Sequence, residues 1–262
     1  MIDLDLSTID KVAGTFMFPL FRVAAMLMVM PIIGSKTVPK KVRLAMAVSI
    51  TFLLFPTMGD SVPAITFGIE TWIEAAKQVA IGTMMGLVLY LMIEVFIMAA
   101  QLMSSQMGLG FANITDPTNG TTVVVVAQFY NILVILMFLS MNGHLVMFEI
   151  LDRSFDVFPV GHEVFNVNVV WSIISKGSWL FASGLLLALP AVTALLIINF
   201  SFGIMTKAAP QINVFSIGFP FTMLMGLFIT WASLDGFMGF FLEINNYILN
   251  FIEELIEEAA NV

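Results

Sequence analysis

Three stretches of the sequence carry no charged side chain: residues 117–148, 177–206 and 208–234. A helix needs about 20 mostly apolar residues to cross the hydrocarbon core of a bilayer, and each stretch is longer than that. Of the 262 residues, 60% are hydrophobic and only 11% are charged, whereas soluble domains have about 25% charged residues. The surplus apolar surface must face lipid or other protein, so we expect an all-α membrane protein.

Six apolar segments are expected to form helices, partly broken and arranged as hairpins. They cover residues 12–33, 44–58, 72–103, 121–150, 169–201 and 214–242. Prolines inside three segments imply kinks or breaks there unless neighbouring helices satisfy the freed carbonyls, and they are Pro19, Pro190 and Pro220. The β-branched run at 121–126 would suit a strand on propensity alone, but its place in an uncharged stretch favours a helix. With no soluble block between segments, we expect a single domain over residues 1–262.

The orientation in the membrane is harder to derive. A basic cluster follows the first segment and should be cytoplasmic by the positive-inside rule; it consists of Lys36, Lys40, Lys41 and Arg43. The fourth segment carries polar side chains at Gln128, Asn131, Ser140, Asn142 and His144. Such polar content suits helices packed against protein better than helices surrounded by lipid. We therefore do not expect six simple crossings.

Several classes of function leave marks that this sequence does not carry. The net charge is −8 and there is no cysteine, so a nucleic-acid partner, a disulfide and a thiolate metal site are not expected. No phosphate-binding loop, paired metal-binding histidines or nucleophile elbow is present. We expect no enzyme activity, no metal and no cofactor. The N-terminus lacks the basic region and cleavage site of a removable signal peptide.

Four charged residues lie inside the first and third apolar segments. Arg22 and Glu94 could mark an ion or proton path, but an ion pair or hydrogen-bonded charge at a subunit contact is the favoured interpretation. Glu74 and Lys77 are three residues apart on a helix and should pair with each other.

Two loops have unusual composition. Residues 104–120 contain glycines and a proline, which exclude a regular helix, together with apolar Met107, Leu109, Phe111 and Ile114. Irregular backbone at membrane depth is tolerated inside protein or along a cavity, so the apolar side chains of this loop could gate a cavity by dewetting, or the loop is an ordinary connection. Residues 202–215 form a tight turn between two helices, and the polar groups at its tip are Lys207, Gln211 and Asn213.

The tail at 243–262 is acidic and amphipathic. Its apolar side chains fall near one helical face, and they are Ile244, Ile248, Phe251, Ile252, Leu255 and Ile256. An acidic helix is repelled by anionic lipid, so a neighbouring protein is the expected contact.

Three stretches resemble the FliR family, the flagellar biosynthetic proteins of the bacterial export gate, whose relatives occur in virulence type III secretion. The first runs from Phe18-Pro19-Leu20-Phe21-Arg22 to Pro39-Lys40-Lys41-Val42-Arg43. The second is residues 106–120, around Gly110-Phe111 and Asp116-Pro117. The third and most specific is residues 208–220, AAPQINVFSIGFP.

The resemblance implies a subunit of a helical pore in the bacterial inner membrane, at the flagellar basal body. Its partners would be FliP-like and FliQ-like subunits, an FlhB-like protein at the cytoplasmic entrance, membrane lipid and the exported unfolded flagellar proteins. Residues 1–200 would be FliP-like, with 169–242 a FliQ-like hairpin and 243–262 the acidic tail. The 106–120 loop would help to plug the pore, and the tip at 206–213 would lie toward the entrance.

The alternative is a secondary transporter or small-solute channel, which shares the broken apolar helices and the buried charges. Such transporters usually show paired repeats and a polar site at the midplane, and neither is recognisable here. An intramembrane enzyme ranks third, because no catalytic pair or nucleophile is evident.

Overall fold

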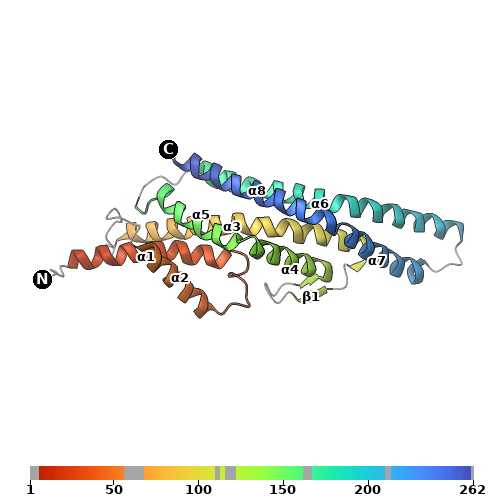
Figure 1. Ribbon diagram of the computed structural model, residues 1–262, viewed down its shortest axis with the longest axis horizontal. Helices are drawn as coiled ribbons and strands as arrows, with labels where there is room; N and C mark the ends of the chain where they lie inside the picture. The colour runs from red at the N-terminus through yellow and green to blue at the C-terminus, as the bar shows by residue number, and fades with distance from the viewer. Residues whose placement is uncertain are drawn as a thin grey trace. The chain divides into compact units, whose positions relative to one another are not determined.

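The computed structural model describes residues 6–55, 68–109, 113–115, 122–161, 167–209 and 214–260. Almost all of these residues are helical, so the expected fold class is confirmed (Figure 1). In chain order the elements are α1 (Leu6–Val29), α2 (Lys40–Leu54), α3 (Ile69–Gln106), β1 (Asn113–Thr115), β2 (Thr122–Val124), α4 (Val125–Ser140), α5 (Gly143–Val157), α6 (Val167–Ala208), α7 (Val214–Ala232) and α8 (Leu234–Ala260).

The chain forms two compact units that interleave along the sequence. Unit 1 comprises residues 1–90, 138–175 and 248–262, and unit 2 comprises residues 91–137 and 176–247. The long helices α3, α6 and α8 contribute to both units.

Unit 1 is built on close packing between α1 and its neighbours. The turn between α1 and α2 is fixed by Arg43, whose Nη2 donates to the carbonyl oxygens of Ser35 at 2.8 Å and Val38 at 3.0 Å. On the other side, Phe18 of α1 is buried with Val160, and Phe155 packs against the pair. Arg43, which belongs to the basic cluster, therefore stabilises this turn, in addition to any effect on the orientation of the chain in the membrane.

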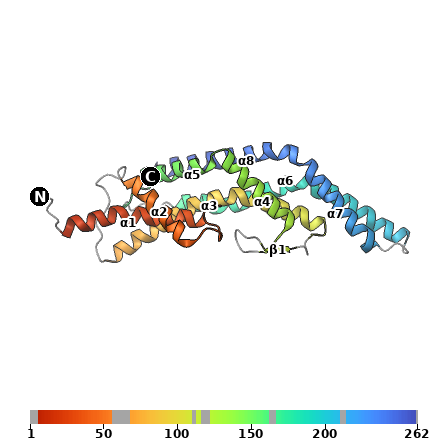
Figure 2. The ribbon, with the colours of Figure 1, turned by 60° about the horizontal axis from the view of Figure 1, so that its bottom comes forward.

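Unit 2 has an aromatic core and a long hairpin. Phe96 of α3 lies 5.2 Å, centroid to centroid, from Phe237 of α8, and Tyr130 of α4 lies 5.1 Å from Phe237. The C-terminal part of α6 and the whole of α7 run side by side as the expected αα-hairpin (Figures 1 and 2). The rings of Phe202 and Phe221 contact each other across it, with centroids 5.4 Å apart.

The helix breaks do not fall at the prolines. Pro19, Pro190 and Pro220 lie inside α1, α6 and α7, each of which continues through its proline. The fourth apolar segment breaks instead at Asn142, which has a left-handed backbone (φ 57°) just before Gly143. The sixth breaks at Ser233, whose hydroxyl donates to the carbonyl oxygen of Ile229 at 2.8 Å. That side-chain bond competes with the helical ladder and favours a bend.

The expectation of a helix from residue 121 was wrong at its start. Thr122–Val124 form β2, which pairs antiparallel with β1 so that Ile114 lies opposite Val123. The β-branched propensity of this run therefore prevails for three residues, and helix α4 begins only at Val125.

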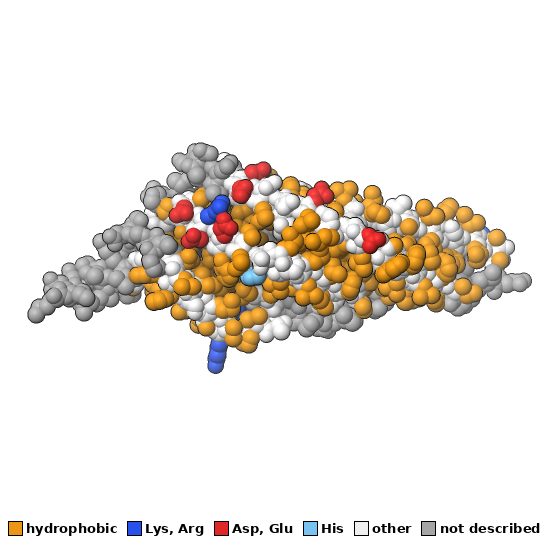
Figure 3. Space-filling model, in the orientation of Figure 1, with side chains coloured by type: hydrophobic (Ala, Val, Ile, Leu, Met, Phe, Trp, Pro, Cys, Tyr) orange, Lys and Arg blue, Asp and Glu red, His pale blue; other side chains and the backbone are white. Residues whose placement is uncertain are grey.

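Two helices in the described part of the chain, α3 and residues 168–208 of α6, are long and apolar enough to cross a bilayer. The number rises to four if each broken pair, α4 with α5 and α7 with α8, counts as one span. The face in Figure 3 is mainly hydrophobic, and the acidic side chains gather over α5 and the end of α8 in unit 1. Among the described residues, α1 offers only a shorter apolar stretch, Ala13–Val29, and α2 has 15 residues.

Candidate functional site

The first candidate site surrounds Arg22, which is fully buried in unit 1 (0% exposed). Its guanidinium donates from Nε to Oε1 of Gln78 at 2.7 Å, and from Nη1 and Nη2 to the carbonyl oxygens of Ser154 at 2.7 Å and Phe158 at 2.6 Å. It also lies 4.1 Å from the ring centroid of Phe155. These partners belong to α3 and to the C-terminal end of α5, where free carbonyls carry partial negative charge.

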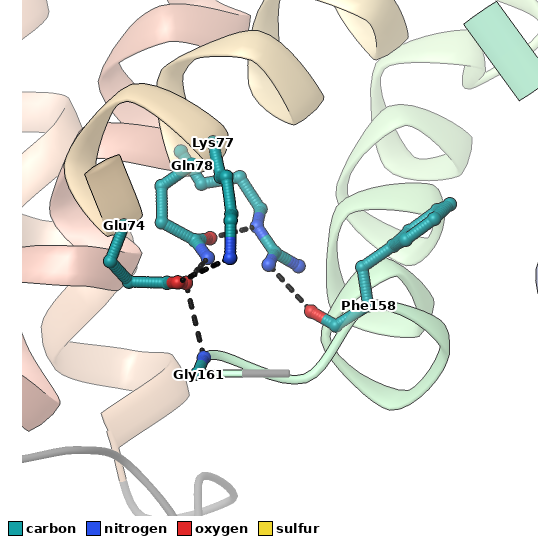
Figure 4. A network of polar contacts seen from close by, with 6 residues as sticks. Glu74, Lys77, Gln78, Phe158 and Gly161 are labelled. Carbon is teal, nitrogen blue, oxygen red and sulfur yellow. Dashed lines mark hydrogen bonds and ion pairs between the residues drawn. The ribbon is translucent and has the colours of Figure 1, made fainter. Parts of the chain in front are cut away.

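A second layer of contacts centres on Glu74 (Figure 4). Its Oε1 accepts from Nε2 of Gln78 at 2.7 Å and from the backbone N–H of Gly161 at 3.1 Å. Lys77 lies 3.4 Å from its Oε2, which confirms the expected pairing three residues apart. The network therefore joins α1, α3 and the turn after α5 through one buried cation and one buried carboxylate.

Glycines on α3 allow the backbone of α1 to approach α3 closely at Arg22. A Cβ at Gly82 would collide with the carbonyl oxygen of Arg22, and a Cβ at Gly86 would lie 2.9 Å from that of Met26. Two small residues four apart let the backbones of α1 and α3 touch, as in many membrane helix pairs. Sequence reasoning missed this role, although the spacing Gly82-x-x-x-Gly86 was a signal for it.

The network supplies Arg22 with partners from its own chain, so no other subunit is needed to satisfy it. Glu94 lies half-buried on α3 within unit 2. Gln78 and Ser154, which complete the Arg22 network, were not expected from the sequence. The only signal was that Gln78 follows Glu74 by one helical turn.

The second candidate site is the end of α3, where the 106–120 loop begins. Met107 is fully buried (0% exposed) and packs against Gly226 of α7. Gly108 has a left-handed backbone (φ 75°) and faces the ring of Phe219. On the other side, Asn199 of α6 donates from Nδ2 to the carbonyl oxygen of Gln106 at 3.2 Å. The first residues of the loop are thus held by both arms of the α6–α7 hairpin.

The remaining residues singled out from the sequence are spread over both loops. Leu109 is half-buried, and Ile114 is the middle residue of β1. Lys207 is exposed in the last turn of α6. Phe111, Gln211 and Asn213 lie outside the described residues. The structure thus assembles only the start of the proposed plug, at Met107.

The acidic tail differs from expectation. Its apolar face is buried in this chain rather than free for a neighbouring protein, since Ile244, Ile248, Phe251, Ile252 and Leu255 are all buried. Ile252 and Leu255 line a small apolar cavity in unit 1 together with side chains of α3, α5 and α6, such as Ile81, Ile150 and Ile173. Side chains of α3, α5 and α6, which are distant from the tail in sequence, therefore cover this part of its apolar face.

Comparison with known families decides between the transporter and export interpretations. The family model described as "Bacterial export proteins, family 1" matches residues 13–247, almost the whole chain. The chain belongs to the FliR family of bacterial export proteins. The flagellar biosynthetic protein FliR of Escherichia coli K12 is 34% identical over 244 residues, 93% of each chain.

Two further FliR proteins extend this similarity. That of Pectobacterium carotovorum is 34% identical over 212 residues, 81% of each chain. That of Bacillus subtilis is 26% identical over 218 residues, covering 82% of this chain and 84% of the relative. As a FliR-family protein, the chain is a membrane component of the flagellar export gate in the basal body.

Proposed function

We propose that this FliR-family chain is a non-catalytic wall subunit of the protein-conducting pore, assembled with FliP-like and FliQ-like subunits. The observation that carries the proposal is the exposed apolar face of α6. This face extends from Trp171 (70% exposed) to Ile204 (55% exposed) on one helix. At 1.5 Å per residue that is about 50 Å, whereas the hydrocarbon core is about 30 Å thick.

Lipid can therefore cover only part of the apolar face of α6. The excess, about 20 Å, is more than helix tilt alone readily absorbs, and neighbouring protein is its natural cover. In this proposal residues 1–200 correspond to a FliP-like part and the hairpin at 169–242 to a FliQ-like part. Half-buried Glu94 would then face a subunit contact.

Assembly is tested by purifying the chain in mild detergent, alone and with FliP-like and FliQ-like subunits. Expressed alone, it should aggregate or be degraded, because α6 keeps its apolar surface uncovered. Expressed together, the three proteins should elute as one stable complex. Recovery of a monodisperse, protease-resistant monomer would contradict the proposal and favour a transporter that works alone.

The second part of the proposal is that Met107, Leu109, Phe111 and Ile114 belong to a plug that shuts the idle pore. The membrane potential drives ions through any open passage, so the pore must close when no substrate is present. Apolar closure is reversible because no strong polar bond has to break. The buried position of Met107 at the start of the loop supports this assignment.

The plug is tested by deleting residues 108–112 and measuring ion leak in cells that contain the assembled gate. The deletion should depolarise the membrane and sensitise cells to small toxic solutes. An unchanged leak, with assembly confirmed by co-purification, would contradict the plug assignment alone. The hairpin tip at Lys207, Gln211 and Asn213 would lie at the cytoplasmic entrance, beside an FlhB-like protein, where unfolded flagellar proteins enter.

A further inference from the structure

Helix α2 presents an apolar face to the outside of unit 1. The helix contacts α1, and its buried residues are Ala47 and Thr51. On another side Leu44, Val48 and Phe52 follow one another at intervals of one turn, and all three are exposed, Phe52 at 70%. An exposed row of large apolar side chains is poorly matched to water and indicates an apolar surrounding.

The whole apolar stretch of α2 suits one leaflet of a bilayer. Residues 44–54 carry no charge, and the hydroxyls of Ser49 and Thr51 donate back to the carbonyl oxygens of Ala45 at 2.9 Å and Ala47 at 2.8 Å. Neither hydroxyl proton therefore needs a partner from outside the helix. At 1.5 Å per residue the stretch is about 16 Å long, close to half of a hydrocarbon core about 30 Å thick.

Three lysines lie at the N-terminal end of this stretch. Lys36, Lys40 and Lys41 are exposed, and within the described part of the chain none of them has a hydrogen-bond or ion-pair partner. The turn fixed by Arg43 holds Lys36 at the same end of α2 as the other two. Cations here oppose the helix dipole, and the first turn of α2 contains no acidic residue. The lysines therefore do not stabilise α2 itself, and they are suited to anions outside the chain.

We propose that α2 enters one leaflet of the membrane, with Lys36, Lys40 and Lys41 at the phosphates of anionic phospholipids and Phe52 among the acyl chains. A neighbouring apolar helix would cover Phe52, but it would leave three unpaired cations at one end unexplained. Lipid supplies both parts at the spacing that α2 requires. The contact sets the depth of unit 1 in the bilayer, and it does not depend on the proposed pore function.

A depth measurement tests whether α2 enters a leaflet. The chain has no cysteine, so a single nitroxide label can be placed at Leu44→Cys, at Phe52→Cys or at Asp152→Cys, an exposed position on α5 that serves as the reference for water. The full-length chain, with the flagellar subunits that co-purify with it, is reconstituted in vesicles of phosphatidylcholine and phosphatidylglycerol. Collisions of the label with oxygen, which concentrates in hydrocarbon, are compared with collisions with a water-soluble nickel chelate.

The label at Phe52 should meet oxygen in preference to nickel, and the label at Leu44 should lie about 12 Å nearer the headgroups, since the two positions are eight residues apart. Equal depth at the two positions would overturn entry into a leaflet. Few collisions with either reagent at Phe52 would show that protein covers α2, and frequent collisions with nickel would show that water does. Either result would also overturn the proposal.

The lysines are tested by replacing all three with glutamine, or with arginine as the variant that keeps their charge. The phosphatidylglycerol retained per chain is measured after purification from mixed vesicles. A lysine near an anionic surface contributes about a fivefold preference, so the glutamine variant should retain severalfold less of this lipid and the arginine variant a normal amount. Lys207→Gln, at an exposed lysine of α6, is the control. Equal retention by the glutamine variant and the unaltered chain, or displacement of the lipid by inorganic phosphate alone, would overturn the assignment of the lysines to phospholipid.

Discussion

Arg22 and Glu74 are linked through the side-chain amide of Gln78. The amide oxygen accepts from Arg22 Nε at 2.7 Å, and the amide nitrogen donates to Glu74 Oε1 at 2.7 Å. The buried cation thus reaches the carboxylate one helical turn away without direct contact. An amide is the group that can do this, because it accepts at one end and donates at the other.

Replacing Gln78 with leucine should therefore destabilise the protein strongly for a single uncharged side chain. It leaves a buried donor on Arg22 and removes a donor from Glu74, with an expected loss of about 2–4 kcal/mol. The measurement is the thermal unfolding midpoint of the purified complex. Gln101→Leu, at an exposed position on the same helix, is the control, and equal effects of the two substitutions would argue against the network.

Gly82→Ala should separate α1 from α3. The added methyl group meets the backbone of Arg22, which cannot rotate away, and such overpacking costs about 1–3 kcal/mol. Gly177→Ala adds the same methyl group to α6 where nothing lies within 4 Å, and should be neutral or stabilising by up to about 1 kcal/mol. Accumulation of each variant in membranes distinguishes them, and similar levels would contradict the close approach.

Ile252→Asp should destabilise the fold of this chain itself, in addition to any effect on its assembly with a neighbouring subunit. The side chain lines the apolar cavity in unit 1, and an unpaired buried charge costs about 3–5 kcal/mol. Protease sensitivity of the variant in detergent is the readout. Glu253→Gln changes charge at the adjacent exposed position and should have little effect. A protease-resistant Ile252→Asp chain that fails only to assemble would show instead that the face meets a partner.

Asn142→Val should weaken the break between α4 and α5, while Asn142→Gly should preserve it. Asn142 has φ 57°, and a left-handed conformation costs an ordinary L-residue about 1–2 kcal/mol, with asparagine and glycine as the usual exceptions. The two variants are compared by thermal unfolding of the co-purified complex. A stability order with valine at or above glycine would contradict the left-handed position.

Local signals in the sequence account for much of the fold. The long apolar segments at 72–103 and 169–201 placed α3 and α6 correctly, and the Asn142-Gly143 dipeptide is a turn signal that could have located the break in the fourth segment. The three prolines do not mark the helix breaks, because a helix flanked by others tolerates proline, the exception expected from the sequence. Contacts between distant residues could not be derived in this way. Arg22 is 56 residues from Gln78 and 132 from Ser154, and nothing in the local pattern of any one helix pairs them.

The same separation in sequence sets the point during synthesis of the chain at which the Arg22 network can form. Phe158, which accepts from Nη2, follows Arg22 by 136 residues. At about 5–20 residues per second, a ribosome needs roughly 7–27 s to make that intervening chain. During this interval Nη1 and Nη2 of Arg22 lack their carbonyl partners, a costly state in a lipid environment. The first helix therefore cannot settle into its final position until the middle of the chain has been synthesised.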